Sequence, residues 1–419
     1  MKKKLLHTPE GVRDIYNLEC ENKLLLQENM HKQLKLYGYK DIQTPTFEFF
    51  DIFSREIGTI PSKDLYKFFD REGDTLVLRP DFTPSIARCA AKYYMDEDMP
   101  IRLCYVGNAF INNSQYQGKL KETTQMGAEL IGDNTVDADA EMIVLVINSL
   151  LESGLTDFQV EIGQTDFFRG LLEDAKITEE LEIELRELIS IKNYFGVEEL
   201  LSGLTMNAEL KEVLFKLPQL FGSIDILNEA KSLTSNPCAI RAIERLESLY
   251  EVLKIYGLEQ YVSFDLGMLS KYKYYTGIIF KAYTFGTGEP IVNGGRYNNL
   301  LSWFGKEAAS IGFVIMVDVL MSALMRQNKE IAITNQNTMI LYRNPQQKQA
   351  IELAQHLRKQ DQNIELVSME EDKTLEECVA YATRNASAVV LAFETDTLIK
   401  KITLKTGDTQ TASIADLLR

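Results

Sequence analysis

A polar stretch at residues 326–337 divides the 419-residue chain into two parts with different sequence patterns. A chain of this length exceeds the size at which one hydrophobic core keeps growing, so two or three domains are expected. Beyond the polar stretch, short apolar runs that favour strands alternate with amphipathic runs that favour helices. This alternation predicts a small α/β domain at residues 338–419, joined by a linker at 326–337 to a larger domain at 1–325.

The larger part mixes strand-like and helix-like runs without regular alternation. Residues 14–37 carry apolar side chains at helical spacing and lead to Gly38, a common helix stop. Two β-prone runs at 65–69 and 75–78 flank turn-forming residues, which predicts a hairpin. Four aromatic residues between these elements are compatible with either a core or a dimer interface: Phe47, Phe49, Phe50 and Phe53.

Two later segments of the larger part also carry local signals. Residues 177–256 contain charge-rich amphipathic stretches and few strand signals, so we expect an inserted helical subdomain there. Gly294-Gly295 follows an expected strand at 275–283 and indicates a tight passage of the chain into the apolar residues that follow.

The charge of the chain argues against nucleic acid as a partner. The formal net charge is -16 and the pI is about 4.9, whereas nucleic-acid affinity comes largely from Lys and Arg that displace counterions. The five cysteines are scattered without a CxxC pair, which indicates a reducing compartment. No signal-peptide core follows the basic start, and the longest apolar stretch, 142–147, is far shorter than the ~20 residues that span a bilayer. We therefore expect a cytoplasmic protein that does not enter a membrane.

Residues that commonly carry nucleophilic or metal chemistry do not form recognisable motifs. His7, His31 and His356 lie near no candidate motif, so surface or packing positions are expected for them rather than a Ser-His-Asp or Cys-His mechanism. Gly286-Thr287-Gly288 lacks the third glycine of a dinucleotide fold, and no Gly-Lys-Ser/Thr loop occurs. No cluster of His, Cys, Asp and Glu has metal-ligand spacing. The sequence thus predicts no cofactor site and no metal site.

Six segments together are far more specific than any one of them. They are Gly11-Val12-Arg13-Asp14-Ile15, Tyr37-Gly38-Tyr39, Leu65-Tyr66-Lys67-Phe68-Phe69-Asp70, Leu78-Arg79-Pro80-Asp81-Phe82-Thr83, Tyr274-Tyr275-Thr276-Gly277 and Gly294-Gly295-Arg296-Tyr297. In order and spacing this set resembles histidyl-tRNA synthetases, over nearly the whole chain. The resemblance implies an α+β fold of the class II aminoacyl-tRNA synthetase type, with a mixed, largely antiparallel sheet flanked by helices. It also implies that the C-terminal α/β domain is similar to an anticodon-binding domain.

The resemblance further implies a pocket for free histidine. Carried over by position, six residues would form this pocket: Asp81, Thr83, Gln125, Glu129, Tyr274 and Tyr275. Asp81 stands where the family has a carboxylate for the ammonium group, and Glu129 is suited to pair with an imidazole N–H. Tyr274 and Tyr275 would frame the ring. Taken alone, each tyrosine is equally compatible with a packed strand residue, but the set favours a pocket.

The chain departs from the synthetase pattern where that pattern grips ATP. The family's second motif would place a phosphate-clamping arginine at Ile111 and a carboxylate at Asn113. Its third motif would end Gly-Leu-Glu-Arg, whereas this chain has Met316-Val317-Asp318-Val319. A further arginine is replaced within Ser270-Lys271-Tyr272-Lys273, where a lysine could supply charge but not the planar fork of arginine. Losing three such donors should leave amino-acid activation negligible.

A synthetase-like histidine pocket without activation residues resembles the regulatory subunits of ATP phosphoribosyltransferase. The resemblance implies no catalytic residues, assembly with a short-form catalytic phosphoribosyltransferase, self-association as a dimer, and L-histidine as an effector in the first step of histidine biosynthesis. Two alternatives stay open. One is an active histidyl-tRNA synthetase with divergent motifs, and the other is a stand-alone histidine-binding sensor.

Overall fold

The structure, a computed structural model, describes residues 6–54, 60–113, 119–269, 275–329 and 337–418. The chain forms two compact units, one of residues 1–14 and 23–331 and the other of residues 15–22 and 332–419. Each unit has its own sheet and its own hydrophobic clusters. Within the described ranges, no helix is both long and apolar enough to cross a bilayer.

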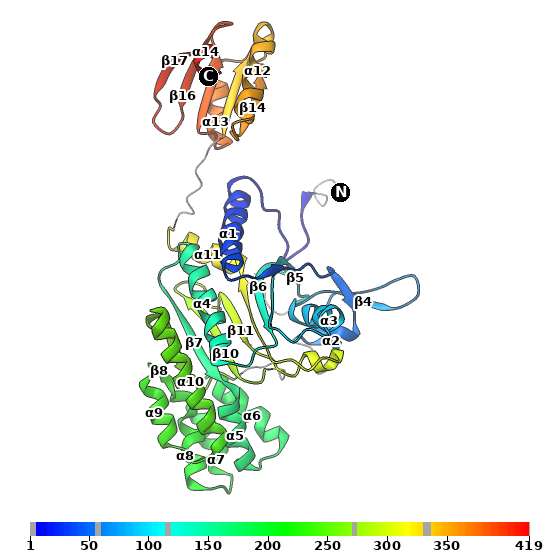
Figure 1. Cartoon of the computed structure of the whole chain (residues 1–419), viewed down its shortest axis with the longest axis vertical. Helices are drawn as coiled ribbons and strands as arrows, with labels where there is room; N and C mark the ends of the chain where they lie inside the picture. Colours follow the sequence, from blue (N-terminus) through cyan, green and yellow to red (C-terminus); the bar gives the residue numbers. More distant parts are fainter. Residues whose placement is uncertain (1–5, 55–59, 114–118, 270–274, 330–336, 419) are drawn as a thin grey trace. The chain divides into compact units, whose positions relative to one another are not determined.

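A nine-stranded sheet forms the centre of the first unit (Figure 1), and its strand order is β1-β5-β6-β12-β11-β10-β7-β9-β8. The strands are β1 (Lys40–Asp41), β5 (Ile101–Phe110), β6 (Glu122–Ile131), β7 (Phe158–Gln164), β8 (Phe221–Gly222), β9 (Val262–Asp265), β10 (Ile278–Thr284), β11 (Val292–Arg296) and β12 (Ser310–Met316). Neighbouring strands run antiparallel except in the pairs β1–β5 and β7–β9. The predicted mixed, largely antiparallel sheet is therefore confirmed.

Helices cover this sheet and extend beyond it. They are α1 (Asn17–Leu36), α3 (Thr83–Tyr93), α4 (Val136–Glu152), α5 (Thr165–Ala175), α6 (Glu179–Ser190), α7 (Tyr194–Ser202), α8 (Ala208–Lys216), α9 (Asp225–Ser232), α10 (Pro237–Tyr256) and α11 (Val317–Arg326). The run from α6 to α10 occupies the segment expected to be a helical insertion. It also contributes β8, which joins the edge of the sheet by pairing with β9.

The core lies between α4 and one face of the sheet. Alternate residues of β6, such as Met126 and Leu130, are buried with Phe313 of β12 and with the apolar side chains of α4. Thr135 caps α4 by accepting a hydrogen bond from the Ala138 N–H. Because strand side chains alternate between faces, the remaining residues of β6 and β12 point to the opposite side of the sheet.

A buried charge cluster fixes β11 to α4 and α10. The Arg296 guanidinium donates from Nε to Asp139 Oδ1 at 2.8 Å, and Arg245 donates to Asp139 Oδ2 at 2.7 Å. Arg296 and Asp139 are almost completely inaccessible to solvent. Removing one partner of such a cluster leaves an uncompensated charge, so Arg296 has a structural role here.

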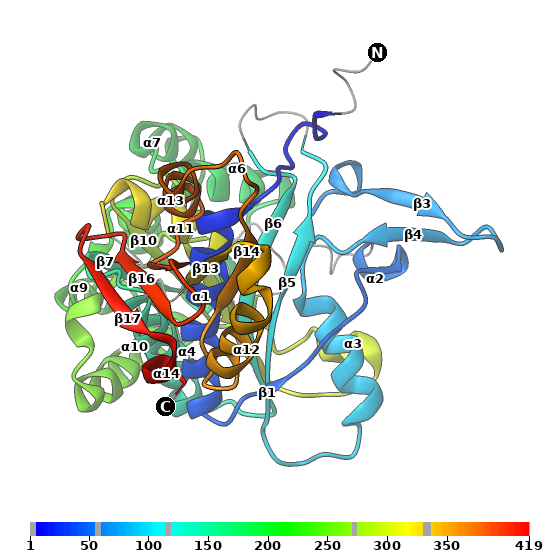
Figure 2. The same cartoon turned by 90° about the horizontal axis from the view of Figure 1, so that it is seen from above.

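A separate three-stranded sheet extends away from the main sheet (Figure 2). Its order is β2 (Phe47–Phe49), β4 (Thr75–Leu78), β3 (Lys67–Phe69), and the short helix α2 (Asp51–Ser54) lies beside it. Strands β3 and β4 pair antiparallel with Phe68 opposite Leu76, so the predicted hairpin is confirmed. Of the four aromatic residues singled out above, Phe53 is buried and Phe50 half-buried, whereas Phe47 and Phe49 are exposed.

The interpretation of Gly294-Gly295 as a tight passage is wrong, because both glycines lie inside β11. A Cβ at Gly294 would overlap the Phe280 ring, and a Cβ at Gly295 would come within 2.7 Å of the Tyr275 ring. Glycine is required here because aromatic rings lie directly against the strand, not because the chain turns.

The second unit has a five-stranded sheet of order β14-β13-β15-β16-β17. Its elements are β13 (Thr338–Tyr342), α12 (Gln347–Arg358), β14 (Ile364–Ser368), α13 (Leu375–Arg384), β15 (Val389–Phe393), β16 (Leu398–Thr403), β17 (Thr409–Ser413) and α14 (Ile414–Leu417). Strand β13 is parallel to β14 and β15, and the last two strands are antiparallel additions. Helices α12 and α14 pack on one face and α13 on the other.

Candidate ligand-binding site

A cavity of about 190 Å³ opens on the face of the main sheet opposite α4. Its polar lining includes Asp81, Thr83, Gln125, Tyr275 and Tyr297. A volume below the usual ~300–1,000 Å³ of drug-sized sites suits a ligand no larger than an amino acid.

The register of β6 and β12 arranges one side of this cavity. Glu129 pairs with Gly312, and Gln125 pairs with Met316, so all four residues share one face of the sheet. A Cβ at Gly312 would overlap the Glu129 carboxyl group. The glycine in β12 therefore makes the space that the carboxyl group of the neighbouring strand occupies.

Glu129 is the most strongly perturbed carboxyl group of the site. Thr83 Oγ1 donates to Glu129 Oε1 at 2.8 Å, and the Tyr297 hydroxyl donates to Oε2. Burial raises the pKa of Glu129 to about 8, and the nearby Asp81 also raises it, while the hydrogen bonds from Tyr297 and Thr83 act in the opposite direction. At neutral pH this carboxyl group is poised to exchange a proton or to accept a hydrogen bond from a ligand.

Two buried polar atoms on β5 and β6 lack hydrogen-bond partners among the described residues. Gln125 is 6% exposed and its Oε1 is unpaired, and the hydroxyl of the buried Tyr105 is unpaired as well. Buried polar atoms are normally satisfied, so an unpaired amide oxygen in a cavity wall is a feature that a donor group of a ligand would explain.

The start of the helix α3 contributes to the lining of the cavity. Asp81 lies just before the helix, and its Oδ1 accepts a hydrogen bond from the Thr83 N–H at 3.2 Å. This contact holds the carboxylate and the threonine hydroxyl side by side at the cavity. The cavity also has an apolar lining that includes Ile60, Ile111, Val314 and Met316.

The structure brings five of the six expected residues together. Asp81, Thr83, Gln125 and Tyr275 line the cavity, and Glu129 lies beneath it. Tyr274 lies outside the described residues. Tyr297 was not among the residues expected in the pocket. The signal that could have identified it is its place at the end of the synthetase-like segment Gly294-Gly295-Arg296-Tyr297.

Among the described residues that line the cavity, none is Lys or Arg. The carboxyl groups of Asp81 and Glu129 favour a ligand that carries an amine or another N–H donor. At the position of the synthetase pattern's third motif, Asp318 accepts from Lys23 Nζ at 2.7 Å and from the Thr124 N–H at 2.6 Å. These contacts tie α11 to α1 and β6.

A larger cavity of about 500 Å³ lies in the second unit and is lined mainly by amide, hydroxyl and charged side chains. It includes Asn337, Asn363 and Ser387, which precede the parallel strands β13, β14 and β15. Ligands of parallel α/β sheets bind beyond the carboxyl ends of the strands, so we place the candidate site in the smaller cavity of the first unit.

A sequence profile described as Histidyl-tRNA synthetase matches residues 11–320. The chain is 39% identical to the ATP phosphoribosyltransferase regulatory subunit of Acetivibrio thermocellus. The match extends over 414 residues and covers 99% of each chain. It is also 39% identical to the subunit of the same name from Ruminiclostridium cellulolyticum, over 99% of this chain and 98% of the relative. The chain belongs to the family of ATP phosphoribosyltransferase regulatory subunits.

Solved structures agree with the family and with the class II fold. A Bacillus halodurans structure described as an ATP phosphoribosyltransferase regulatory subunit/histidyl-tRNA synthetase superposes with a TM-score of 0.82 and 34% identity, covering 90% of this chain and 96% of that chain. The histidyl-tRNA synthetase of Nostoc has the same TM-score at 18% identity, over 99% and 98% of the chains. The regulatory-subunit family thus has the synthetase fold, as the resemblance predicted.

Proposed function

We propose that the chain is a non-catalytic subunit that assembles with a short-form ATP phosphoribosyltransferase and makes its activity responsive to L-histidine. The partner performs the first step of histidine biosynthesis, and this chain supplies the histidine site. The relatives are named as regulatory subunits of ATP phosphoribosyltransferase, and the role of histidine is inferred from the lining of the cavity.

The lining of the cavity supports this proposal, because it combines residues suited to bind an amino acid with an aliphatic residue where the synthetase pattern would place a phosphate-binding arginine. In this proposal Asp81 accepts a hydrogen bond from the ammonium group of histidine, and Glu129 accepts one from its imidazole N–H. Ile111 lines the cavity, and its aliphatic side chain cannot donate hydrogen bonds to a phosphate. The arrangement favours binding of histidine without its activation by ATP.

Linkage explains how binding could control another chain. A ligand shifts an equilibrium only by its differential affinity for the two states, so histidine must bind the active and inhibited assemblies with different strength. A coupling free energy of about 1–3 kcal/mol, typical of such systems, corresponds to a 5- to 150-fold change in affinity. The test must therefore be made on the assembled complex.

Reconstitution with a short-form phosphoribosyltransferase tests the proposal directly. The rate of formation of phosphoribosyl-ATP is measured for the catalytic chain alone, for the complex, and for the complex with L-histidine. We expect the complex to be faster than the catalytic chain alone and histidine to lower its rate.

A variant in this chain shows whether the cavity is the histidine site. Gly312→Ala places a methyl group against the Glu129 carboxyl group and should abolish the histidine response while activation of the partner persists. Gly203→Ala is the matched control, because its Cβ would approach no described atom closer than 3.8 Å. The proposal would be overturned if adding this chain did not change the rate of the catalytic chain. It would also be overturned by histidine-dependent exchange of pyrophosphate into ATP at synthetase rates.

A further inference from the structure

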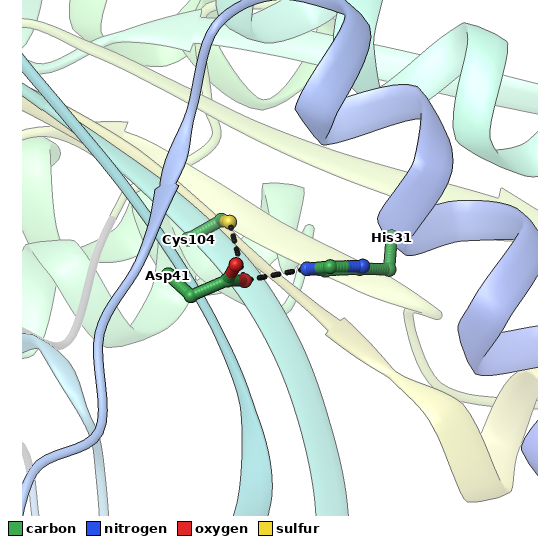
Figure 3. Close-up of side chains that lie close together, drawn as sticks. All are labelled: His31, Asp41 and Cys104. Carbon is green, nitrogen blue, oxygen red and sulfur yellow. Dashed lines mark hydrogen bonds and ion pairs between the residues drawn. The ribbon is translucent and has the colours of Figure 1, made fainter.

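A second group of chemically reactive side chains lies outside the cavity, on α1, β1 and β5 (Figure 3). His31 Nε2 lies 2.5 Å from Asp41 Oδ1, and Cys104 Sγ donates to the same oxygen at 3.5 Å. One nitrogen, one oxygen and one sulfur atom thus lie within 4.8 Å of one another. Neither the ligand-binding cavity nor the proposed regulation uses these residues.

The fold places these three side chains together by independent contacts. Asp41 of β1 pairs directly with Cys104 of β5 in parallel register, which sets the carboxyl group beside the thiol. Met30 and Leu34 of α1 are fully buried and fix that helix on the core, which brings His31 to the same place. The convergence is therefore built on packed elements rather than on a loop.

The two oxygens of Asp41 have different surroundings. Oδ1 faces His31 and Cys104, whereas Oδ2 accepts from Lys35 Nζ at 2.9 Å. Lys35 thus holds the carboxylate with one oxygen directed at the nitrogen and sulfur. Partners beyond the ligands commonly fix the orientation of metal-binding side chains in this way.

We propose that His31, Asp41 and Cys104 bind a divalent transition-metal ion, with zinc as the best chemical match. Imidazole nitrogen, carboxylate oxygen and thiolate sulfur are the three ligand types that zinc takes in proteins. Three protein ligands leave a fourth tetrahedral position for water, and the exposure of His31 and Asp41 gives that position access to solvent. A bound ion would join α1 to the edge of the main sheet.

Binding would replace contacts that exist in the metal-free protein. The short contact between His31 and Asp41 would open so that both atoms face the ion. Burial raises the pKa of the Cys104 thiol to about 12, so coordination must release a proton from the sulfur. Lys35 would stay next to the coordinated carboxylate, where its charge limits the affinity.

Cobalt(II) is a suitable probe because it substitutes for zinc and reports its ligands by its colour. The full-length chain is treated with EDTA, freed of chelator and titrated with CoCl₂. We expect saturation at one equivalent, visible bands of a four-coordinate ion and a near-ultraviolet thiolate-to-cobalt band, all abolished by ZnCl₂. The midpoint of thermal unfolding should rise with either metal, because a ligand of the native state alone stabilises it.

Variants assign the signal to the cluster. Cys104→Ala should remove the thiolate band, and His31→Gln, a substitution on a partly exposed helix surface, should weaken cobalt binding at least tenfold. His356→Gln and Cys378→Ala are matched controls in the second unit and should keep the full signal. Absence of the thiolate band in the unmodified chain, or its survival in Cys104→Ala, would show that the cluster is only a hydrogen-bonded contact between α1 and the sheet.

Discussion

Glu129 reduces the stability of the fold that contains it. Its pKa lies at about 8 in the folded chain against an ordinary value of 4.5, so between these pH values the folded state binds more protons than the unfolded state. The free energy of unfolding must therefore fall as the pH rises from about 4.5 through 8. A pKa difference of one corresponds to about 1.4 kcal/mol, so the cost above pH 8 is a few kcal/mol. A buried carboxyl group retained at such a cost fits a binding role better than a packing role.

Glu129→Gln tests both the stability cost of this carboxyl group and its role in binding. The amide has nearly the same shape as the carboxyl group and carries no charge. Between pH 5 and pH 9 the free energy of unfolding should therefore fall less in the variant than in the parent chain, and at pH 9 the two decreases should differ by a few kcal/mol. Histidine affinity should fall by about 1–3 kcal/mol, the value of a charged hydrogen bond. Urea unfolding across the pH range and titration calorimetry with histidine measure the two effects.

Glu161→Gln on β7 is the matched control for this prediction. Burial also raises the pKa of Glu161, but this residue does not line the cavity. The control should show a pH trend of the same sign without any change in histidine affinity. Equal histidine affinity in Glu129→Gln and the parent chain would place the effector site elsewhere.

Elements with a clear local pattern of apolar and turn residues could be predicted from the sequence. Strand β11, which borders the site, could not. The first helix and the β3–β4 hairpin are confirmed because helical spacing and turn residues act locally. Strand β11 was misinterpreted because its glycines resemble a turn, although they accommodate the rings of Phe280 and Tyr275. Such ring contacts join residues far apart in the chain, and local propensity contains no information about them.

The β2–β4–β3 sheet exposes an aromatic face that we propose as a dimer contact. Phe47 and Phe49 are 52% and 55% exposed, and Phe47 packs edge to face against Phe68 with ring centroids 5.8 Å apart. Cross-strand pairing places Phe49 and Phe68 opposite Leu76, so these side chains share one face. An apolar face of this kind on a small sheet favours association with another surface.

Phe49→Glu should therefore convert a dimer to a monomer in sedimentation velocity. Burying an unpaired carboxylate costs several kcal/mol, so the dissociation constant should rise at least ~100-fold. Phe69→Glu is the control, because Phe69 is 73% exposed but lies opposite Thr75, at the end of the hairpin ladder and away from Phe49. A parent chain that sediments as a monomer, or equal effects of both variants, would contradict the assignment of this face.

The fold brings together residues that are far apart in the sequence, and their spacing along the chain does not reveal these contacts. The resemblance to synthetases placed Asp81, Gln125 and Glu129 in one pocket, and the geometry brings them together. The cluster of His31, Asp41 and Cys104 does not match the sequence spacing of any known metal motif, because its three members come from α1, β1 and β5. Only the register of β1 with β5 and the packing of α1 create it.

The whole fold is that of a synthetase, so the proposed lack of amino-acid activation rests on a few positions and can be tested at one of them. Ile111→Arg would place a guanidinium in the lining of the cavity, where it could contact a phosphate. We expect no histidine-dependent exchange of pyrophosphate into ATP in this variant, because Val319 still replaces the arginine that ends the family's third motif. One missing donor to developing negative charge already costs about a hundred- to a thousandfold in rate. Exchange well above the parent chain would show that Ile111 alone blocks activation, and that the rest of the fold remains competent to hold ATP.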